Sequence, residues 1–134
     1  MKCLIILLLF LTLCNSNRGG ESVYKTEYLH SQPGDITIIK TDSQTIFGIH
    51  NEFGIGKAKI ILIEGSWPSH AILRLHLKGL EGVSIYGSGK KYDKFNLIIN
   101  HKNIMGQNYF DITLPSSLFT SGKVLHFSWV DFYR

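Results

Sequence analysis

The chain has little cysteine and little alanine, and each shortage excludes a class of protein. Its 134 residues include two cysteines, Cys3 and Cys14, both near the amino end. A disulfide framework in the rest of the chain is therefore excluded. Alanine occurs only at Ala58 and Ala71. Because alanine is the strongest helix former, its scarcity argues against a helical fold.

Long apolar runs and blocks of like charge are also missing. A membrane-spanning helix needs about 20 apolar residues, and no stretch of the chain reaches that length. We therefore expect no transmembrane span in the mature chain. Lys and Arg number 14 against 10 Asp and Glu, and the longest block of like charge is Lys90-Lys91. This mild basic excess does not indicate a nucleic-acid partner.

Residues 1–16 have the layout of a signal peptide. Lys2 supplies the positive start, residues 4–13 form a nearly continuous apolar run, and small residues follow. We expect cleavage of 1–16 and export, so that the protein is secreted, periplasmic or attached to the envelope. Cys14 closes the run as the lipid-bearing cysteine of a bacterial lipoprotein does, which makes lipidation an alternative. Leu13 argues against it, because that position normally holds a small side chain.

The remaining chain is rich in strand formers. Fifteen isoleucines follow residue 16, and β-branched residues favour strands. Clusters of Gly, Pro, Asn and Ser divide the chain, which predicts strands at 23–29, 35–40, 45–50, 58–64, 71–78, 83–86, 94–100, 109–114 and 123–132. The one helical candidate is a turn at 115–119. Eight or nine short strands predict a single all-β domain over 17–134, an antiparallel jelly-roll-like β-sandwich.

Alternating side chains predict which faces of these strands are buried. Within 71–78, alternate residues are apolar, so one face belongs to the core. The last strand, 123–132, is apolar on both faces and is therefore expected in the centre of its sheet. Asp131 would then need a partner, and Arg74 or Arg134 is the candidate for a charge-assisted bond.

Several blocks of the sequence resemble a known group of proteins. They are Gly54-Ile55-Gly56-Lys57-Ala58, Trp67-Pro68, Leu73-Arg74-Leu75-His76-Leu77-Lys78-Gly79-Leu80-Glu81 and Trp129-Val130-Asp131-Phe132-Tyr133-Arg134. The blocks lie within residues 46–134 and resemble short exported bacterial proteins of unassigned function, with the terminal Trp-x-Asp-Phe-Tyr-Arg motif as the most specific part. The resemblance implies an exported bacterial β-domain and carries no catalytic residues.

Motifs for catalysis or cofactor binding are incomplete. The Gly54-Ile55-Gly56 segment lacks the third glycine of a dinucleotide loop and precedes a strand, so it is predicted to be a turn. The six histidines form no His-x-His or His-x-x-x-His pair, so we predict no metal and no cofactor. We predict no catalytic residue. The alternative is an enzyme, either metal-dependent and cupin-like with His76, His126 and Asp111, or a hydrolase with Asp111 and Asp131.

Two loops combine aromatic with polar side chains. Trp67 lies in a Gly-Ser-Trp-Pro turn, and Tyr86 and Tyr92 flank a loop that contains Lys90 and Lys91. Exposed rings beside amines and hydroxyls suit sugar rings and acidic groups, so these five residues are the predicted ligand-binding set. The alternative for Trp67 is a plug over the core. The resulting hypothesis is an exported, non-catalytic module that binds glycan or an envelope protein, with no prediction of its oligomeric state.

Overall fold

The computed structural model describes residues 22–28, 35–50, 55–119 and 122–131. The expected signal peptide with Cys14, and the last three residues of the terminal motif, lie outside these ranges. The chain divides into two compact units. Unit 1 comprises residues 1–24 and 62–67, and unit 2 comprises residues 25–61 and 68–134. In the described part, no helix has the length and apolar character needed to cross a membrane.

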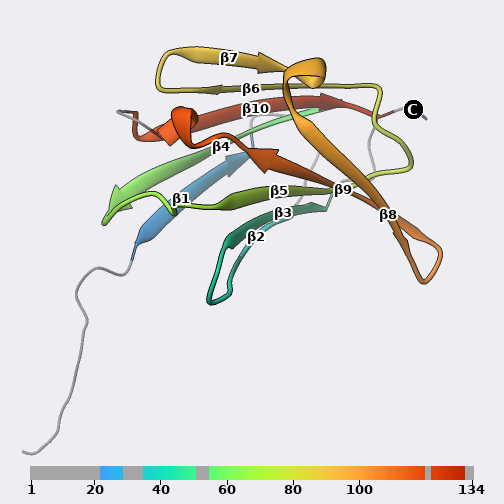
Figure 1. Ribbon diagram of the computed structural model, residues 1–134, viewed down its shortest axis with the longest axis horizontal. Helices are drawn as coiled ribbons and strands as arrows, with labels where there is room; N and C mark the ends of the chain where they lie inside the picture. Colours follow the sequence, from blue (N-terminus) through green and yellow to red (C-terminus); the bar gives the residue numbers. More distant parts are fainter. Residues whose placement is uncertain (1–21, 29–34, 51–54, 120–121, 132–134) are drawn as a thin grey trace, which may run out of the picture. The chain divides into compact units, whose positions relative to one another are not determined.

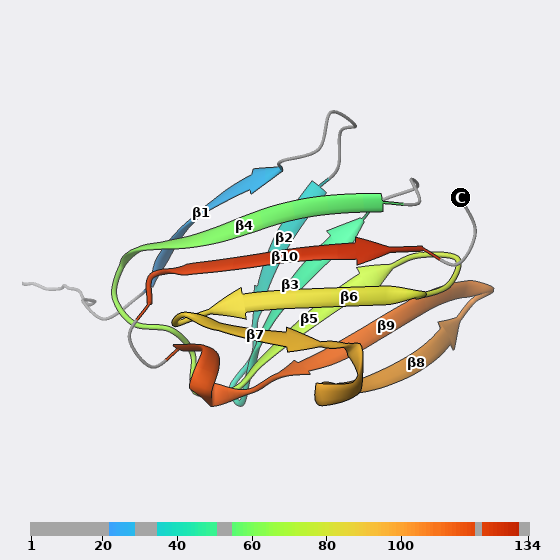
Figure 2. The same ribbon diagram turned by 90° about the horizontal axis from the view of Figure 1, so that it is seen from above.

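The described residues form ten strands and two short 3₁₀ helices. The elements are β1 (Val23–Tyr28), β2 (Asp35–Lys40), β3 (Thr45–His50), β4 (Ile55–Glu64), β5 (Ala71–His76), β6 (Gly82–Gly87), β7 (Lys90–Asp93), η1 (Lys94–Asn96), β8 (Ile98–Ile104), β9 (Gln107–Leu114), η2 (Ser116–Phe119) and β10 (Val124–Val130). The first sheet has the order β1-β4-β10-β6-β7, and the second has the order β2-β3-β5-β9-β8 (Figures 1 and 2). The all-β prediction is confirmed.

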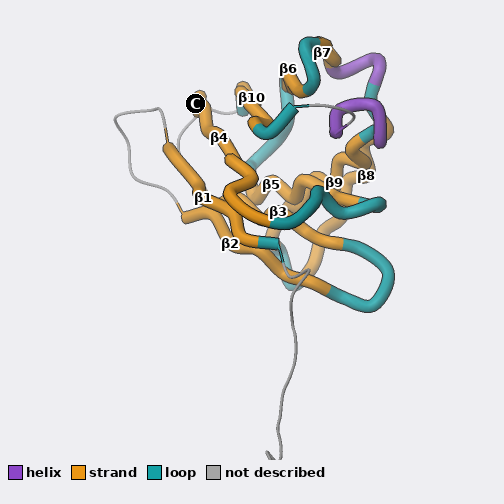
Figure 3. The backbone as a smooth tube through the Cα atoms, turned by 90° about the vertical axis from the view of Figure 1, so that its left-hand side faces the viewer, coloured by secondary structure: helices purple, strands orange, loops and turns teal. Residues whose placement is uncertain are grey.

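Within unit 2, the two sheets form separate layers in a sandwich-like arrangement (Figure 3). Burial alternates along β5 and along β10, as expected for strands with one face on a core. The buried apolar side chains come from both sheets and include Phe47, Ile49, Ala58, Ile60, Leu73, Leu75, Ile85, Ile112, Leu125, Phe127 and Trp129. The predicted core face of β5 is therefore confirmed.

The prediction of a wholly antiparallel fold is wrong at one pair of strands. β3 and β5 run parallel, with Gly48 opposite Arg74 and His50 opposite His76. The reason is the path of the chain between them, since β4 lies in the other sheet. The chain crosses to the first sheet along β4 and returns, so β5 enters the second sheet in the same direction as β3.

The described residues contain ten strands, so the expected eight or nine was an underestimate. The missed strand is β7, because the predicted loop after β6 is a hairpin turn of only two residues, Ser88 and Gly89. Their φ angles of 51° and 76° are both positive, as a type I′ turn requires. Met105 and Gly106 form the matching turn between β8 and β9, with φ angles of 54° and 81°. The strand expected at 94–100 is shifted, since 94–96 form η1.

The last strand is central in the first sheet, as predicted, because β10 pairs with β4 on one side and with β6 on the other. Of the two partners expected for Asp131, Arg134 lies outside the described residues, and Arg74 does not fill this role. The Asp131 carboxylate accepts hydrogen bonds from the backbone amides of Lys78 (3.1 Å) and Gly79 (2.8 Å). Arg74, one of the two expected partners, instead pairs with Asp111. Backbone amides in the segment that follows β5 thus hold the carboxylate of Asp131, a residue that is only 2% exposed.

Gly56 lies directly opposite Trp129 in the pairing of β4 with β10. A Cβ atom on Gly56 would lie 2.1 Å from Cζ2 of the indole. The turn predicted at Gly54-Ile55-Gly56 is therefore wrong for Ile55 and Gly56, which begin β4, while Gly54 lies outside the described residues. Gly56 lies in the strand because its missing side chain makes room for a buried tryptophan.

We expect Gly56→Ala to lower the free energy of unfolding by about 2–3 kcal/mol, because the indole cannot give way inside a packed core. Urea unfolding measures the effect. Gly82→Ala on β6 is the matched control, since a Cβ there meets no atom within 4 Å. Equal effects of the two substitutions would contradict this account of Gly56.

Candidate functional site

The β6–β7 hairpin carries four of the five residues predicted to bind ligand. Tyr86 lies opposite Lys91, and Tyr92 lies opposite the buried Ile85. Because neighbouring positions on a strand face opposite sides, Tyr86 and Tyr92 do not share a surface. Tyr86 is 45% exposed, and Lys91 Nζ lies 5.7 Å from the centre of its ring. The hydroxyl of Tyr92 hydrogen bonds with Ser117 on η2, and Lys90 is exposed beside the turn.

Trp67, the fifth predicted residue, belongs to unit 1. Its side chain is partly buried, and its ring centre lies 5.6 Å from that of Tyr24 in the same unit. Ser22 donates a hydrogen bond to the carbonyl of the preceding Ser66. Within this unit Trp67 thus packs against a second aromatic ring.

An open hollow of about 260 Å³ lies on the second sheet, on the face opposite the core. The residues around it come from five different segments: Thr37, Ile39, Ile46, Gly48, Ile49, His50, Arg74, His76, Ile104 and Tyr109. We call it the outer-face hollow. All of these residues belong to unit 2. This site was not predicted from the sequence.

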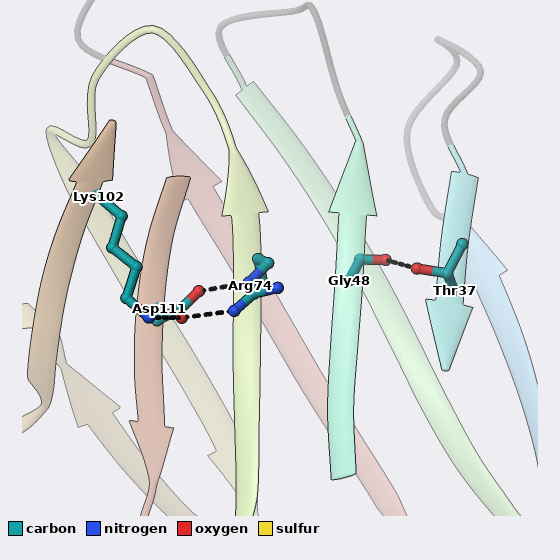
Figure 4. Close-up of polar contacts among 5 residues, drawn as sticks. All are labelled: Thr37, Gly48, Arg74, Lys102 and Asp111. Carbon is teal, nitrogen blue, oxygen red and sulfur yellow. Dashed lines mark hydrogen bonds and ion pairs between the residues drawn. The ribbon is translucent and has the colours of Figure 1, made fainter. Parts of the chain in front are cut away.

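The register of the second sheet explains why these residues meet. Thr37 lies opposite Gly48, Gly48 opposite Arg74, and Arg74 opposite Asp111. Figure 4 shows these four side by side across the sheet, together with Lys102 from the edge strand. Directly opposed residues share a face. Side chains alternate between the two faces of each strand, so the neighbours of these residues face the core and this row lies on the opposite face of the sheet.

Arg74, Asp111 and Lys102 form one ionic cluster beside the hollow. Arg74 donates from Nε to Oδ1 of Asp111 at 2.7 Å and from Nη2 to Oδ2 at 2.9 Å. Lys102 Nζ lies 3.2 Å from Oδ2. The side chain of Asp111 is 4% exposed, while those of Arg74 and Lys102 are 31% and 48% exposed. The cluster carries one net positive charge, and its positive ends are the accessible ones.

The two cations determine the ionisation of Asp111. Burial alone would raise the pKa of this carboxyl, but hydrogen bonds from Arg74 and Lys102, and then their charges, bring it below its ordinary value. The hydrogen bond to Asp111 raises the pKa of Arg74. A lowered pKa keeps Asp111 ionised, whereas a general acid needs a raised one. The carboxylate is therefore suited to holding the two cations in place.

Three rings stand in a row along one side of the hollow. His50, His76 and Tyr109 lie opposite one another on β3, β5 and β9. The His76 and Tyr109 rings are stacked with centres 4.9 Å apart, and the His50 and His76 rings meet edge to face at 5.5 Å. Such contacts fix the orientation of each ring. The row gives the hollow a wall of three aromatic rings in mutual contact.

Gly48 leaves space in the hollow because it has no side chain. A Cβ atom there would lie 2.7 Å from Oγ1 of Thr37. That hydroxyl donates a hydrogen bond to the Gly48 carbonyl at 3.4 Å. The guanidinium of Arg74 thus borders a position without a side chain on its β3 side.

The sequence held a partial signal for this site. His76 and Asp111 appeared in the enzyme alternative, and Arg74 was expected to pair with a different aspartate. Arg74 and Asp111 are each the one Asp, Glu, Lys or Arg of their strand, but their mutual contact depends on strand order. Across the described ranges, no group of three or more His, Cys, Asp or Glu side chains could hold a metal ion.

No protein-family model matches this chain, and comparisons with curated proteins and with solved structures found no significant match.

Proposed function

We propose that this chain is an exported, non-catalytic module of the cell envelope or secretome, and that its outer-face hollow binds part of a glycan. Export is supported by the signal-peptide layout of residues 1–16 and by the resemblance to exported bacterial proteins. As part of the same proposal, the two sheets are wound as a variant of the jelly roll that includes one parallel pair.

The observation that carries the proposal is the combination of a row of aromatic rings and hydrogen-bonding groups around one open hollow. His76 and the Tyr109 ring stacked on it supply aromatic groups, and Arg74 and Thr37 supply polar groups. A sugar presents the same pairing, because it has an apolar ring face and a rim of hydroxyls. Protein segments more often bind at a sheet edge or along an elongated groove, whereas this hollow lies on a sheet face.

Glycan binding by the mature chain, residues 17–134, tests the proposal. We expect Tyr109→Ala to weaken binding at least about fivefold, since an aromatic contact contributes roughly 1 kcal/mol. Isothermal titration against the glycans selected by a panel measures the change. Tyr86→Ala is the matched control, because Tyr86 is an exposed tyrosine on the other sheet.

The opposite result would move the site. Binding that survives Tyr109→Ala but is lost in Tyr86→Ala would place the ligand at the hairpin that carries Tyr86 and Lys91. A panel without any bound glycan would contradict the proposed ligand class and leave a protein partner as the alternative.

A further inference from the structure

We infer that the glycan bound at the outer-face hollow is acidic, that its carboxylate binds Arg74, and that Lys102, on the other side of Asp111, adds positive charge nearby. This inference rests on the proposed function and specifies the class of ligand. Its first support is the charge of the site. Asp111 neutralises only one of two cations, and its own side chain is covered. An incoming group therefore meets positive charge.

The second support is the orientation of the guanidinium. Asp111 occupies Nε and one N–H of Nη2. A guanidinium has five N–H groups, so its far end presents Nη1 and the other N–H of Nη2 as a second pair of donors. Figure 4 shows a guanidinium nitrogen on the side of Gly48, away from Asp111. A carboxylate fits such a planar pair with two parallel hydrogen bonds.

Asp111 also prepares Arg74 for this role. The two bonds to a buried carboxylate hold a side chain that otherwise has many rotamers, so a ligand need not order it on binding. Lys102 is held to the same carboxylate from the neighbouring strand. The two positive groups are therefore fixed before the ligand arrives.

The third support is the size and lining of the hollow. Its volume of about 260 Å³ lies just below the roughly 300–1,000 Å³ typical of small-molecule pockets. It therefore suits one charged ring better than a helix or a folded partner. Ile39 and Ile46 line it together with the row of His50, His76 and Tyr109. A uronic acid combines one sugar ring, which has an apolar face, with one carboxylate, and it matches both the lining and the charge.

Oligogalacturonate and its methyl ester provide a matched pair of probes, because esterification removes the charge and keeps the sugar chain. We expect the mature protein to bind the acid at least about tenfold more tightly than the ester, as charge-assisted bonds to the carboxylate are lost in the ester. Raising the salt concentration should reduce the difference in affinity between the acid and the ester, because salt screens the charges. Titration calorimetry measures both values.

Lys102→Gln tests whether the positive charge of Lys102 contributes to binding. We expect it to weaken binding of the acid about fivefold and to leave binding of the ester unchanged, since it removes one partly exposed charge. Lys57→Gln is the control, because it removes the same charge from an exposed position on β4 in the other sheet. Thermal melts of both variants verify that they fold.

The possible outcomes separate the inference from the proposed function. If acid and ester bind equally well and Tyr109→Ala weakens the binding of both, the inference of an acidic ligand is wrong and the proposed glycan site still holds. If the protein prefers a sulfated oligosaccharide to the uronate, the inference that the bound group is a carboxylate is wrong. Absence of binding to every charged and neutral glycan would refute the proposed function itself.

Discussion

A chain that ends at residue 122 is expected to lose cooperative folding, because the truncation removes β10 from the middle of the first sheet. β10 pairs along its length with β4 and also with β6, so its loss leaves two unpaired strand edges. Leu125, Phe127 and Trp129 are each 1% exposed. Truncating one such side chain costs about 2–5 kcal/mol, and the three together are comparable with the roughly 5–15 kcal/mol that stabilises a domain.

Circular dichroism during heating measures this effect. Two point variants extend the test. Phe127→Ala should lower the free energy of unfolding by about 3–5 kcal/mol. Val124→Ala, at a position 42% exposed, should lower it by less than about 1 kcal/mol. A truncated protein that stays soluble and melts cooperatively would show that β10 is dispensable.

Replacing Asp111 with alanine is expected to destabilise the protein by about 3 kcal/mol, the lower end of the range for breaking a buried ion pair. The lower end applies because Arg74 and Lys102 are partly exposed and water can solvate them in the variant. Urea unfolding at neutral pH measures the loss. Asp111→Asn keeps the shape of the side chain and separates the loss of charge from the loss of volume. A variant as stable as the parent would show that the cluster contributes nothing to folding.

The same residue predicts a pH dependence with a definite sign. The pKa of Asp111 is lower in the folded protein than its ordinary value of 3.8, so the unfolded chain binds this proton at higher pH than the folded chain does. The stability due to Asp111 is therefore fully present above that ordinary value and is lost as the pH falls through the folded pKa.

We expect the stability difference between the parent and Asp111→Asn to be constant from pH 7 to about pH 5 and to shrink below about pH 4. Urea unfolding of both proteins at pH 7, 5, 4 and 3 measures the difference. If the free energies of unfolding of the parent and of Asp111→Asn differ by the same amount at every pH, another group causes the acid sensitivity.

Part of this architecture could be predicted from the sequence because it depends on local pattern. Alternation of apolar residues indicates the buried face of β5, and apolar residues on both faces indicate the central place of β10. The β6–β7 turn shows the limit of such reasoning. Its glycines were recognised, but the turn also needs a positive φ at Ser88, a conformation that its sequence does not specify.

The sequence by itself therefore determined the fold class and the buried faces of strands such as β5, since each depends on residues close together in the chain. Only the tertiary structure decided which strands became neighbours. Arg74 and Asp111 are 37 positions apart, and Gly48 reaches Arg74 because β4 crosses to the other sheet and β5 returns parallel to β3. Strand order is set by how all the apolar faces are buried together, so the outer-face hollow exists only once the strands of the second sheet have assembled.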